Sequence, residues 1–136
     1  MRKSLIVTGL AVLVLCLGGC IFIVKDETHD HEGMSSGGTI AEIDAVGKLS
    51  FDSERKRGYE RIAQREGLSP EAQVYLVEAV LDKLSFDNAK EAVLLALIEN
   101  PDFSSAAESE ILDRIDRLAF ESSKNKILKA ISDRKN

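Results

Sequence analysis

Residues 84–88, Leu84-Ser85-Phe86-Asp87-Asn88, decide the fold because nearly the same pentapeptide occurs three times in the chain. The other copies are Leu49-Ser50-Phe51-Asp52-Ser53 and Leu118-Ala119-Phe120-Glu121-Ser122, so the copies begin 35 and then 34 residues apart. Periods of this length are typical of stacked helical hairpins, each too thin to bury its own apolar face. The sequence therefore predicts an all-α stack of short antiparallel helical hairpins.

Apolar residues outside the pentapeptide follow the same period. A shift of 35 residues pairs Ile62 with Leu97, and a shift of 34 pairs Leu97 with Ile131. The apolar positions fall at spacings of three and four, which places them on one face of a helix. We expect helices at about 39–48, 53–66, 70–83, 88–99, 104–117 and 122–134.

Residues that start and stop helices lie between these segments. Ser69-Pro70 is typical of an N-cap followed by proline at the first helical position. The next helix is expected to start at Ser104 or Ser105, and Ser105-Ala106-Ala107-Glu108 has the pattern of a capping box. Asn100-Pro101 is expected to end a helix, because proline has no backbone N–H and disfavours a helical residue before it. Gly67 is expected to end the helix at about 53–66.

The recurring phenylalanines Phe51, Phe86 and Phe120 each come just before a predicted helix. An apolar residue in that position can pack on the next helical turn. We expect each ring to fill the joint between successive hairpins. The alternative is a strip of aromatic side chains that serves as a binding surface.

The turns also resemble those of a known family. Leu84–Lys90 and Leu118–Lys124 resemble the Phe-Ser-Phe-Asp/Glu-Ser-x-Lys turns of an uncharacterised bacterial domain-of-unknown-function family, in which a short helix follows each turn. The resemblance covers roughly residues 49–136. The first copy departs from the pattern, with Arg55-Lys56 where a single lysine is expected. The resemblance implies no activity, cofactor or catalytic residue.

Residues 1–24 have the pattern of a signal peptide or a membrane anchor. Arg2-Lys3 precedes Leu5–Val24, a run of 20 residues without charge. As a helix, this run would be about 30 Å long, which is enough to cross a bilayer. The positive-inside rule then predicts that the rest of the chain lies outside the cytoplasm, in a bacterial periplasm or on the cell surface.

A lipoprotein signal is the second interpretation of the same segment. Leu17-Gly18-Gly19-Cys20 resembles the lipobox of bacterial lipoproteins, which implies that Cys20 is lipidated and becomes the mature N-terminus. The apolar stretch Ile21–Val24 after the cysteine fits an uncleaved anchor better. Both interpretations predict attachment to a membrane.

Residues 25–38 are expected to form a flexible acidic linker to a helical-repeat domain at 39–136. The linker is rich in Asp, Glu, Gly and Ser and lacks apolar periodicity. It contains both histidines of the chain, His29 and His31, flanked by carboxylates. These two imidazoles are candidate ligands for a divalent metal, although a solvated tether explains the same residues.

Charge limits the class of partner. The chain carries a formal net charge of −5 at pH 7, which argues against a nucleic-acid partner. Arg57, Arg61 and Arg65 follow one another at spacings of four and are expected to line one helix face. This stripe is our candidate for a surface that binds a partner, and a solvated helix face is the alternative.

No catalytic site is expected. Residues 39–136 contain no His, Cys or Trp and no glycine-rich phosphate loop. Their Ser, Lys, Asp and Glu residues recur at caps and on helix surfaces, where structural roles account for them. We therefore expect neither enzyme activity nor a cofactor.

These features predict a membrane-anchored helical-repeat protein of the bacterial envelope that binds or organises another envelope protein. One alternative is a metal-binding envelope protein that uses His29 and His31. A second alternative is a structural lipoprotein without a specific partner.

Overall fold

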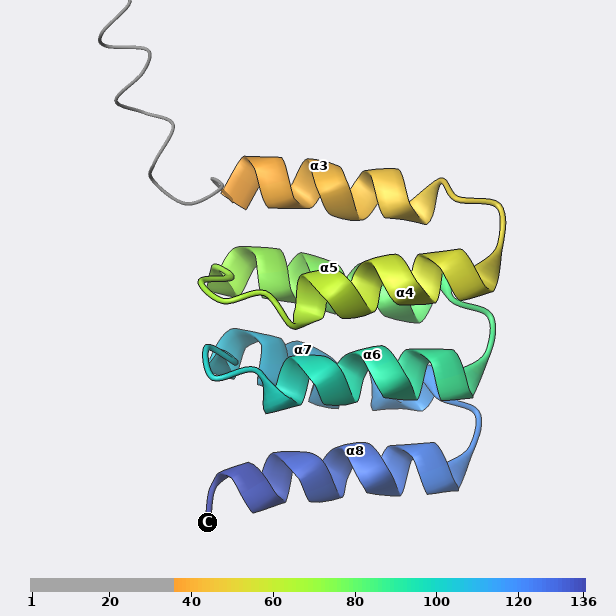
Figure 1. Cartoon of the computed structure of the whole chain (residues 1–136). Coiled ribbons are helices and arrows are strands. Elements are labelled where there is room, and N and C mark those ends of the chain that lie inside the picture. Colours follow the sequence, from red (N-terminus) through yellow and green to blue (C-terminus); the bar gives the residue numbers. More distant parts are fainter. Residues whose placement is uncertain (1–35) are drawn as a thin grey trace, which may run out of the picture. The chain divides into compact units, whose positions relative to one another are not determined.

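The computed structural model describes residues 36–136, and this part of the chain contains only helices (Figure 1). The predicted all-α fold is confirmed. The elements are α3 (Ser36–Gly47), α4 (Asp52–Ala63), α5 (Pro70–Lys83), α6 (Asp87–Glu99), α7 (Ser105–Asp113), the 3-10 helix η2 (Ile115–Arg117) and α8 (Glu121–Arg134).

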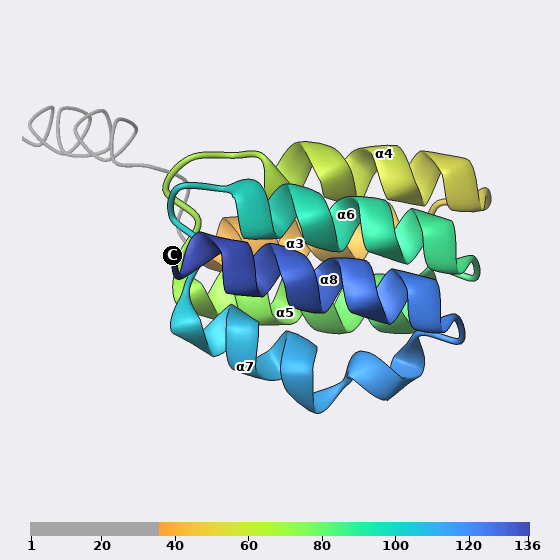
Figure 2. The same cartoon turned by 90° about the horizontal axis from the view of Figure 1, so that it is seen from below.

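The helices form two layers. Helices α4, α6 and α8 lie side by side in one layer, and α3, α5 and α7 lie in the other (Figure 2). Successive helices run in opposite directions, so that α4, α6 and α8 all begin at the same end of the molecule (Figure 1). The turns after α4 and α6 lie at the opposite end.

The core is a single apolar cluster contributed by all the helices of the two layers. Ile62, Leu97 and Ile131, which the sequence period makes equivalent, are 0%, 0% and 5% exposed. Leu128 is equivalent to the buried Leu94 but is 42% exposed, because no further helix of the described chain covers α8. Within the helices, the apolar period therefore identifies the core positions where a neighbouring helix is present.

Helix ends differ from the prediction at several places. Helix α3 begins at Ser36, so residues 36–38, predicted as linker, are helical. Helix α4 ends at Ala63 rather than at about residue 66. Helix α7 ends at Asp113, and the chain continues in the 3-10 helix η2. Arg114 has φ −113° and ψ 17°, outside the α-helical region, so the α-helix stops before it.

The serine caps are confirmed only in part. Ser69 Oγ accepts a hydrogen bond from the Ala72 N–H (3.2 Å), as expected for an N-cap followed by Pro70. In α7 the N-cap is Ser104, whose Oγ accepts from the Ala107 N–H (3.2 Å). Of the two predicted starts, Ser104 is confirmed, and the predicted capping box at Ser105 is wrong by one residue. Gly67 has a φ of 72°, so it lies in the left-handed region that favours glycine.

Polar contacts join neighbouring helices of one layer at both ends. At the end where α4 begins, the Asp52 carboxylate accepts from the Ser85 N–H (3.0 Å). Asp87 accepts in the same way from the Phe120 N–H (2.7 Å). These bonds join each copy of the pentapeptide to the next one along the layer.

The opposite end has a second recurring contact. The side chain of Asn100 donates to the carbonyl oxygens of Ala63 (2.7 Å) and Arg65 (2.8 Å), just past the end of α4. Arg134, the equivalent residue 34 positions later, donates to the carbonyl oxygen of Ile98 in α6 (2.9 Å). Each contact satisfies carbonyl groups that a helix end leaves without an intrahelical partner.

Candidate functional site

The most unusual surface feature is a set of three exposed phenylalanines. Phe51, Phe86 and Phe120 are 67%, 64% and 63% exposed. The expectation that these rings fill the joints between hairpins is therefore wrong. Leu84 and Leu118, two residues earlier in the same turns, occupy that space and are 3% and 1% exposed.

The three rings form a row, which we call the aromatic edge (Phe51, Phe86 and Phe120). Each phenylalanine is the N-cap residue of one helix of the same layer, α4, α6 or α8. These three helices pack side by side and begin at the same end of the molecule (Figure 1). Packed helices lie about 8–10 Å apart, so the aromatic edge repeats at roughly that spacing.

The acidic residue after each of the first two phenylalanines, Phe51 and Phe86, is already engaged. Asp52 binds the Ser85 N–H and the Arg55 guanidinium (3.1 Å), and Asp87 binds the Phe120 N–H. Partial burial by itself would raise the pKa of Asp52, but these hydrogen bonds outweigh it and hold the pKa below 3.8. These carboxylates therefore join the layer together, whereas the rings remain available for contact.

The arginine stripe predicted from the sequence is only partly a free surface. Arg65 lies beyond the end of α4 and binds both carboxylate oxygens of Glu42 in α3 (3.0 and 2.8 Å). Arg61 is 3.9 Å from the same carboxylate. Arg57 and Arg61 border an open hollow of about 330 Å³ between α3 and α4, and the other residues around it are Val46, Leu49, Glu54 and Gly58. The stripe thus contains one structural arginine and two surface arginines.

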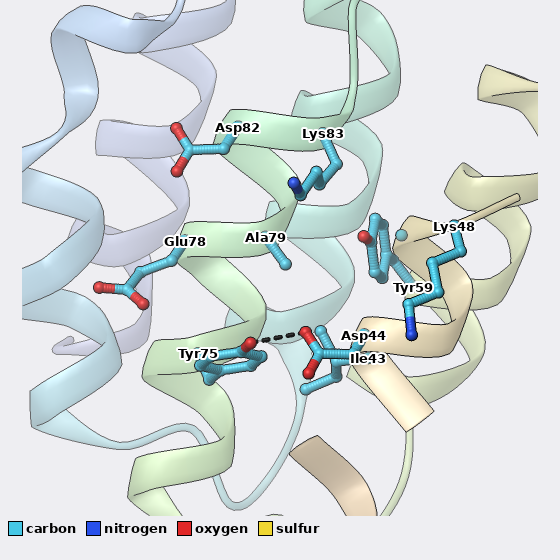
Figure 3. Close-up of a pocket in the computed structure, with 10 residues that line it drawn as sticks. Ile43, Asp44, Lys48, Tyr59, Tyr75, Glu78, Ala79, Asp82 and Lys83 are labelled. Atoms are coloured by element: carbon cyan, nitrogen blue, oxygen red, sulfur yellow. Dashed lines mark hydrogen bonds between the residues drawn. The ribbon is translucent and has the colours of Figure 1, made fainter. Parts of the chain in front are cut away.

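A pocket that sequence reasoning missed lies between α3 and α5, with Tyr59 of α4 at its base (Figure 3). Its volume is about 270 Å³. Its lining includes Tyr59 and Tyr75, which are the two tyrosines of the chain. The presence of only two tyrosines in the chain was the one feature of the sequence that could have drawn attention to them. Nothing in their spacing predicts that they share a pocket.

The two tyrosines differ in their surroundings. The Tyr75 hydroxyl donates to Asp44 (2.6 Å), and this hydrogen bond raises the pKa of Tyr75. Tyr59 is fully buried, and its hydroxyl has no hydrogen-bond partner among the described residues. Burial raises the pKa of Tyr59 to about 12, so the hydroxyl keeps its proton at neutral pH.

The other predicted site residues, Cys20, His29 and His31, lie outside the described residues, as do the predicted anchor and most of the linker. Within residues 36–136 there is no group of three or more His, Cys, Asp or Glu side chains placed to hold a metal ion. In the same range, no helix combines the length and the apolar character needed to cross a bilayer.

No protein-family model, no curated protein and no solved structure matches this chain.

Proposed function

We propose that this chain is a membrane-anchored interaction module of the bacterial envelope and that it docks a partner protein on the aromatic edge. In this proposal the two helical layers are a single stack of 34–35-residue hairpin repeats, and residues 1–24 attach that stack to a membrane. The domain then acts by presenting a rigid face at high local concentration near the membrane.

The exposure of a recurring residue is the single observation that carries the proposal. Internal repeats keep apolar residues at positions where packing needs them, as at Ile62 and Leu97. Phe51, Phe86 and Phe120 recur just as regularly, yet about two thirds of the surface of each residue is exposed. Packing within the domain therefore does not account for their recurrence, whereas contact with a partner does, because aromatic residues are enriched in interface cores.

The spacing of the aromatic edge indicates the kind of partner. The rings repeat at about 8–10 Å, the distance between packed helices. Residues i and i+7 of an α-helix are about 10.5 Å apart along its axis and point in nearly the same direction. We therefore propose that the partner is an amphipathic helix lying across the N-termini of α4, α6 and α8, with an apolar residue at every seventh position.

Site-specific photo-cross-linking in cells tests this proposal. A photoreactive phenylalanine analogue replaces Phe86 in the full-length chain, where it preserves an aromatic ring at the centre of the row. The matched control carries the same analogue at Leu112, which is apolar and 39% exposed but belongs to α7 in the other layer.

The expected result is one saturable protein adduct from position 86 that is absent from position 112. Mass spectrometry of the adduct then locates the cross-linked segment, which should be helical and amphipathic. The same scatter of abundant neighbours from both positions would overturn the proposal and favour a structural lipoprotein. Adducts with lipid alone from position 86 would likewise overturn it, since the edge would then face a membrane.

A further inference from the structure

The pocket between α3 and α5 has a chemistry that the proposed function does not use. We propose that it binds a small organic carboxylate, with the carboxylate group held by Lys48, Lys83 and the Tyr59 hydroxyl. This inference does not rest on the aromatic edge, because none of the three phenylalanines lines the pocket.

The first argument is the buried hydroxyl of Tyr59. A buried polar group without a hydrogen bond costs about 1–3 kcal/mol, so such groups are rare unless something satisfies them. Tyr59 Oη has no hydrogen-bond partner among the described residues. Tyr59 lines a pocket of about 270 Å³. The hydroxyl is closed to solvent in this conformation, so as a protonated phenol it can donate to a ligand only after an exposed side chain of the pocket, such as Lys83, has moved aside.

The second argument is that the lysines of the pocket lack partners whereas its acids have them. Neither Lys48 nor Lys83 forms an ion pair within residues 36–136; in this range Asp82 pairs with Arg117 (2.7 Å). Glu78 and Asp82 also lie 3.6 Å from Arg114. Glu78 and Asp82 are therefore each already near a cation that lies outside the pocket lining.

The directions of the acidic side chains agree with this division. In Figure 3 the carboxylates of Glu78 and Asp82 extend away from Tyr59, and Lys83 lies across α5 with its ammonium group turned away from the Tyr59 ring. Asp44 accepts the hydrogen bond of Tyr75 and so faces a donor of its own. The groups left to meet a ligand are two ammonium groups and one hydroxyl, and these are the donors that a carboxylate requires.

The remaining lining suits a ligand with an apolar body. Ala79 and the Tyr75 ring contribute carbon surface beside the lysines, above the buried Ile43 and Tyr59. A volume of about 270 Å³ lies just below the usual range for small-molecule sites, about 300–1,000 Å³, so the ligand should be small.

Gly47 places no side chain against the hydroxyl. A Cβ at this position would lie 3.0 Å from Tyr59 Oη and 3.7 Å from Lys83 Cγ. Any larger residue would therefore occupy the space between the hydroxyl and the lysine. Lys83 is exposed, so its side chain can move aside to admit a ligand at little cost.

Intrinsic fluorescence provides a direct assay. The chain has two tyrosines and no tryptophan, so its emission comes from the two residues that line this pocket. The full-length protein in detergent micelles is titrated with hexanoate, which does not absorb at the excitation wavelength. Hexanamide, with the same body and no charge, and inorganic phosphate, with charge and no apolar body, serve as comparison ligands.

The expected result is a saturable change with hexanoate that is at least about tenfold weaker with hexanamide and with phosphate. Lys83→Ala and Lys48→Ala should each weaken hexanoate binding by about tenfold. Tyr59→Phe should weaken it similarly, and Lys56→Ala, which alters a lysine outside the pocket, should leave it unchanged. Circular dichroism confirms that each variant retains its helical content.

Two results would overturn the inference. One is the absence of saturation with hexanoate in the parent protein. The other is an equal response in the parent, in Lys83→Ala and in Lys48→Ala, which would mean that hexanoate acts by entering the micelle. Neither result bears on the photo-cross-linking at Phe86, so the two proposals succeed or fail separately.

Discussion

At the scale of single residues, Gly58 shows how closely α3 and α4 approach each other. A Cβ at position 58 would lie 2.7 and 2.9 Å from the two methyl carbons of Val46, which is shorter than real contacts allow. Because both residues are buried, the neighbouring helix has to shift to make room.

We predict that Gly58→Ala destabilises the domain by about 1–3 kcal/mol, despite the higher helix propensity of alanine. Urea unfolding followed by circular dichroism measures the change. Adding Val46→Ala in the same chain should recover part of the loss, since it removes the clashing methyl groups. If the double variant lost more free energy of unfolding than the two single variants lose together, close packing would be the wrong explanation.

Tyr59 should make the stability depend on pH in the alkaline range. In the unfolded chain the phenol loses its proton near pH 10, whereas in the folded domain its pKa is about 12. Between these values the unfolded state binds fewer protons than the folded state, so the free energy of unfolding falls as the pH rises.

The free energy of unfolding should fall by about 2–3 kcal/mol between pH 10 and pH 12 because of Tyr59. Deprotonation of lysines lowers it further over the same range. Tyr59→Phe has no such proton to lose and should show a smaller decline over the same range, as measured by urea unfolding at each pH. Identical pH profiles for the parent and this variant would contradict the burial of the hydroxyl.

At the scale of helices, side chains from one helix satisfy the end of the next. Asn100 is 4% exposed and donates to two carbonyl groups at the end of α4. We predict that Asn100→Ala costs about 1–3 kcal/mol, because these carbonyls would lose their partner away from solvent. The melting temperature should fall by several degrees in a calorimetric scan.

Asn88→Ala is the matched control for this variant. Asn88 is exposed and lies in the first turn of α6, so the same change of residue should shift stability by less than about 0.5 kcal/mol. Equal effects at the two positions would show that the contact with α4 is not what Asn100 contributes.

The arginines near α4 should also differ in how much they contribute to stability. Arg65→Glu would place two carboxylates together at Glu42 and should destabilise the domain by about 1 kcal/mol or more. Arg57→Glu, at an exposed position without an ion pair in the described chain, should have almost no effect on stability. Denaturant unfolding of both variants tests this, and any binding study of the stripe should therefore change Arg57 and Arg61 only.

At the scale of the whole molecule, the aromatic edge should be dispensable for folding. We predict that replacing Phe51, Phe86 and Phe120 together by Ser shifts the melting temperature by only a few degrees, because the rings are largely exposed. Leu118→Ser, at a position that is 1% exposed, should destabilise the domain severely.

The triple variant should nevertheless lose its partner. With the photoreactive residue moved to the neighbouring Leu49, which is 40% exposed, the adduct should appear in the parent and disappear in the triple variant. A stable triple variant that still forms the adduct would place the docking surface elsewhere.

The sequence by itself determined the helices and most of the core. Hydrogen bonds within a helix and a serine cap depend on residues close in the chain, so the helix from Pro70 and its cap at Ser69 could be predicted. The 34–35-residue period added the buried positions Ile62, Leu97 and Ile131, because equivalent residues meet equivalent neighbours.

Only the tertiary structure decided which of the remaining residues face solvent and which face one another. Leu118 and Phe120 are both apolar and lie two residues apart, but the leucine fills the joint and the ring is exposed. Arg65 meets Glu42 across 23 residues, and the Tyr59 pocket joins three helices. The physical reason is that burial and pairing depend on what the fold brings beside a residue, which local periodicity does not specify.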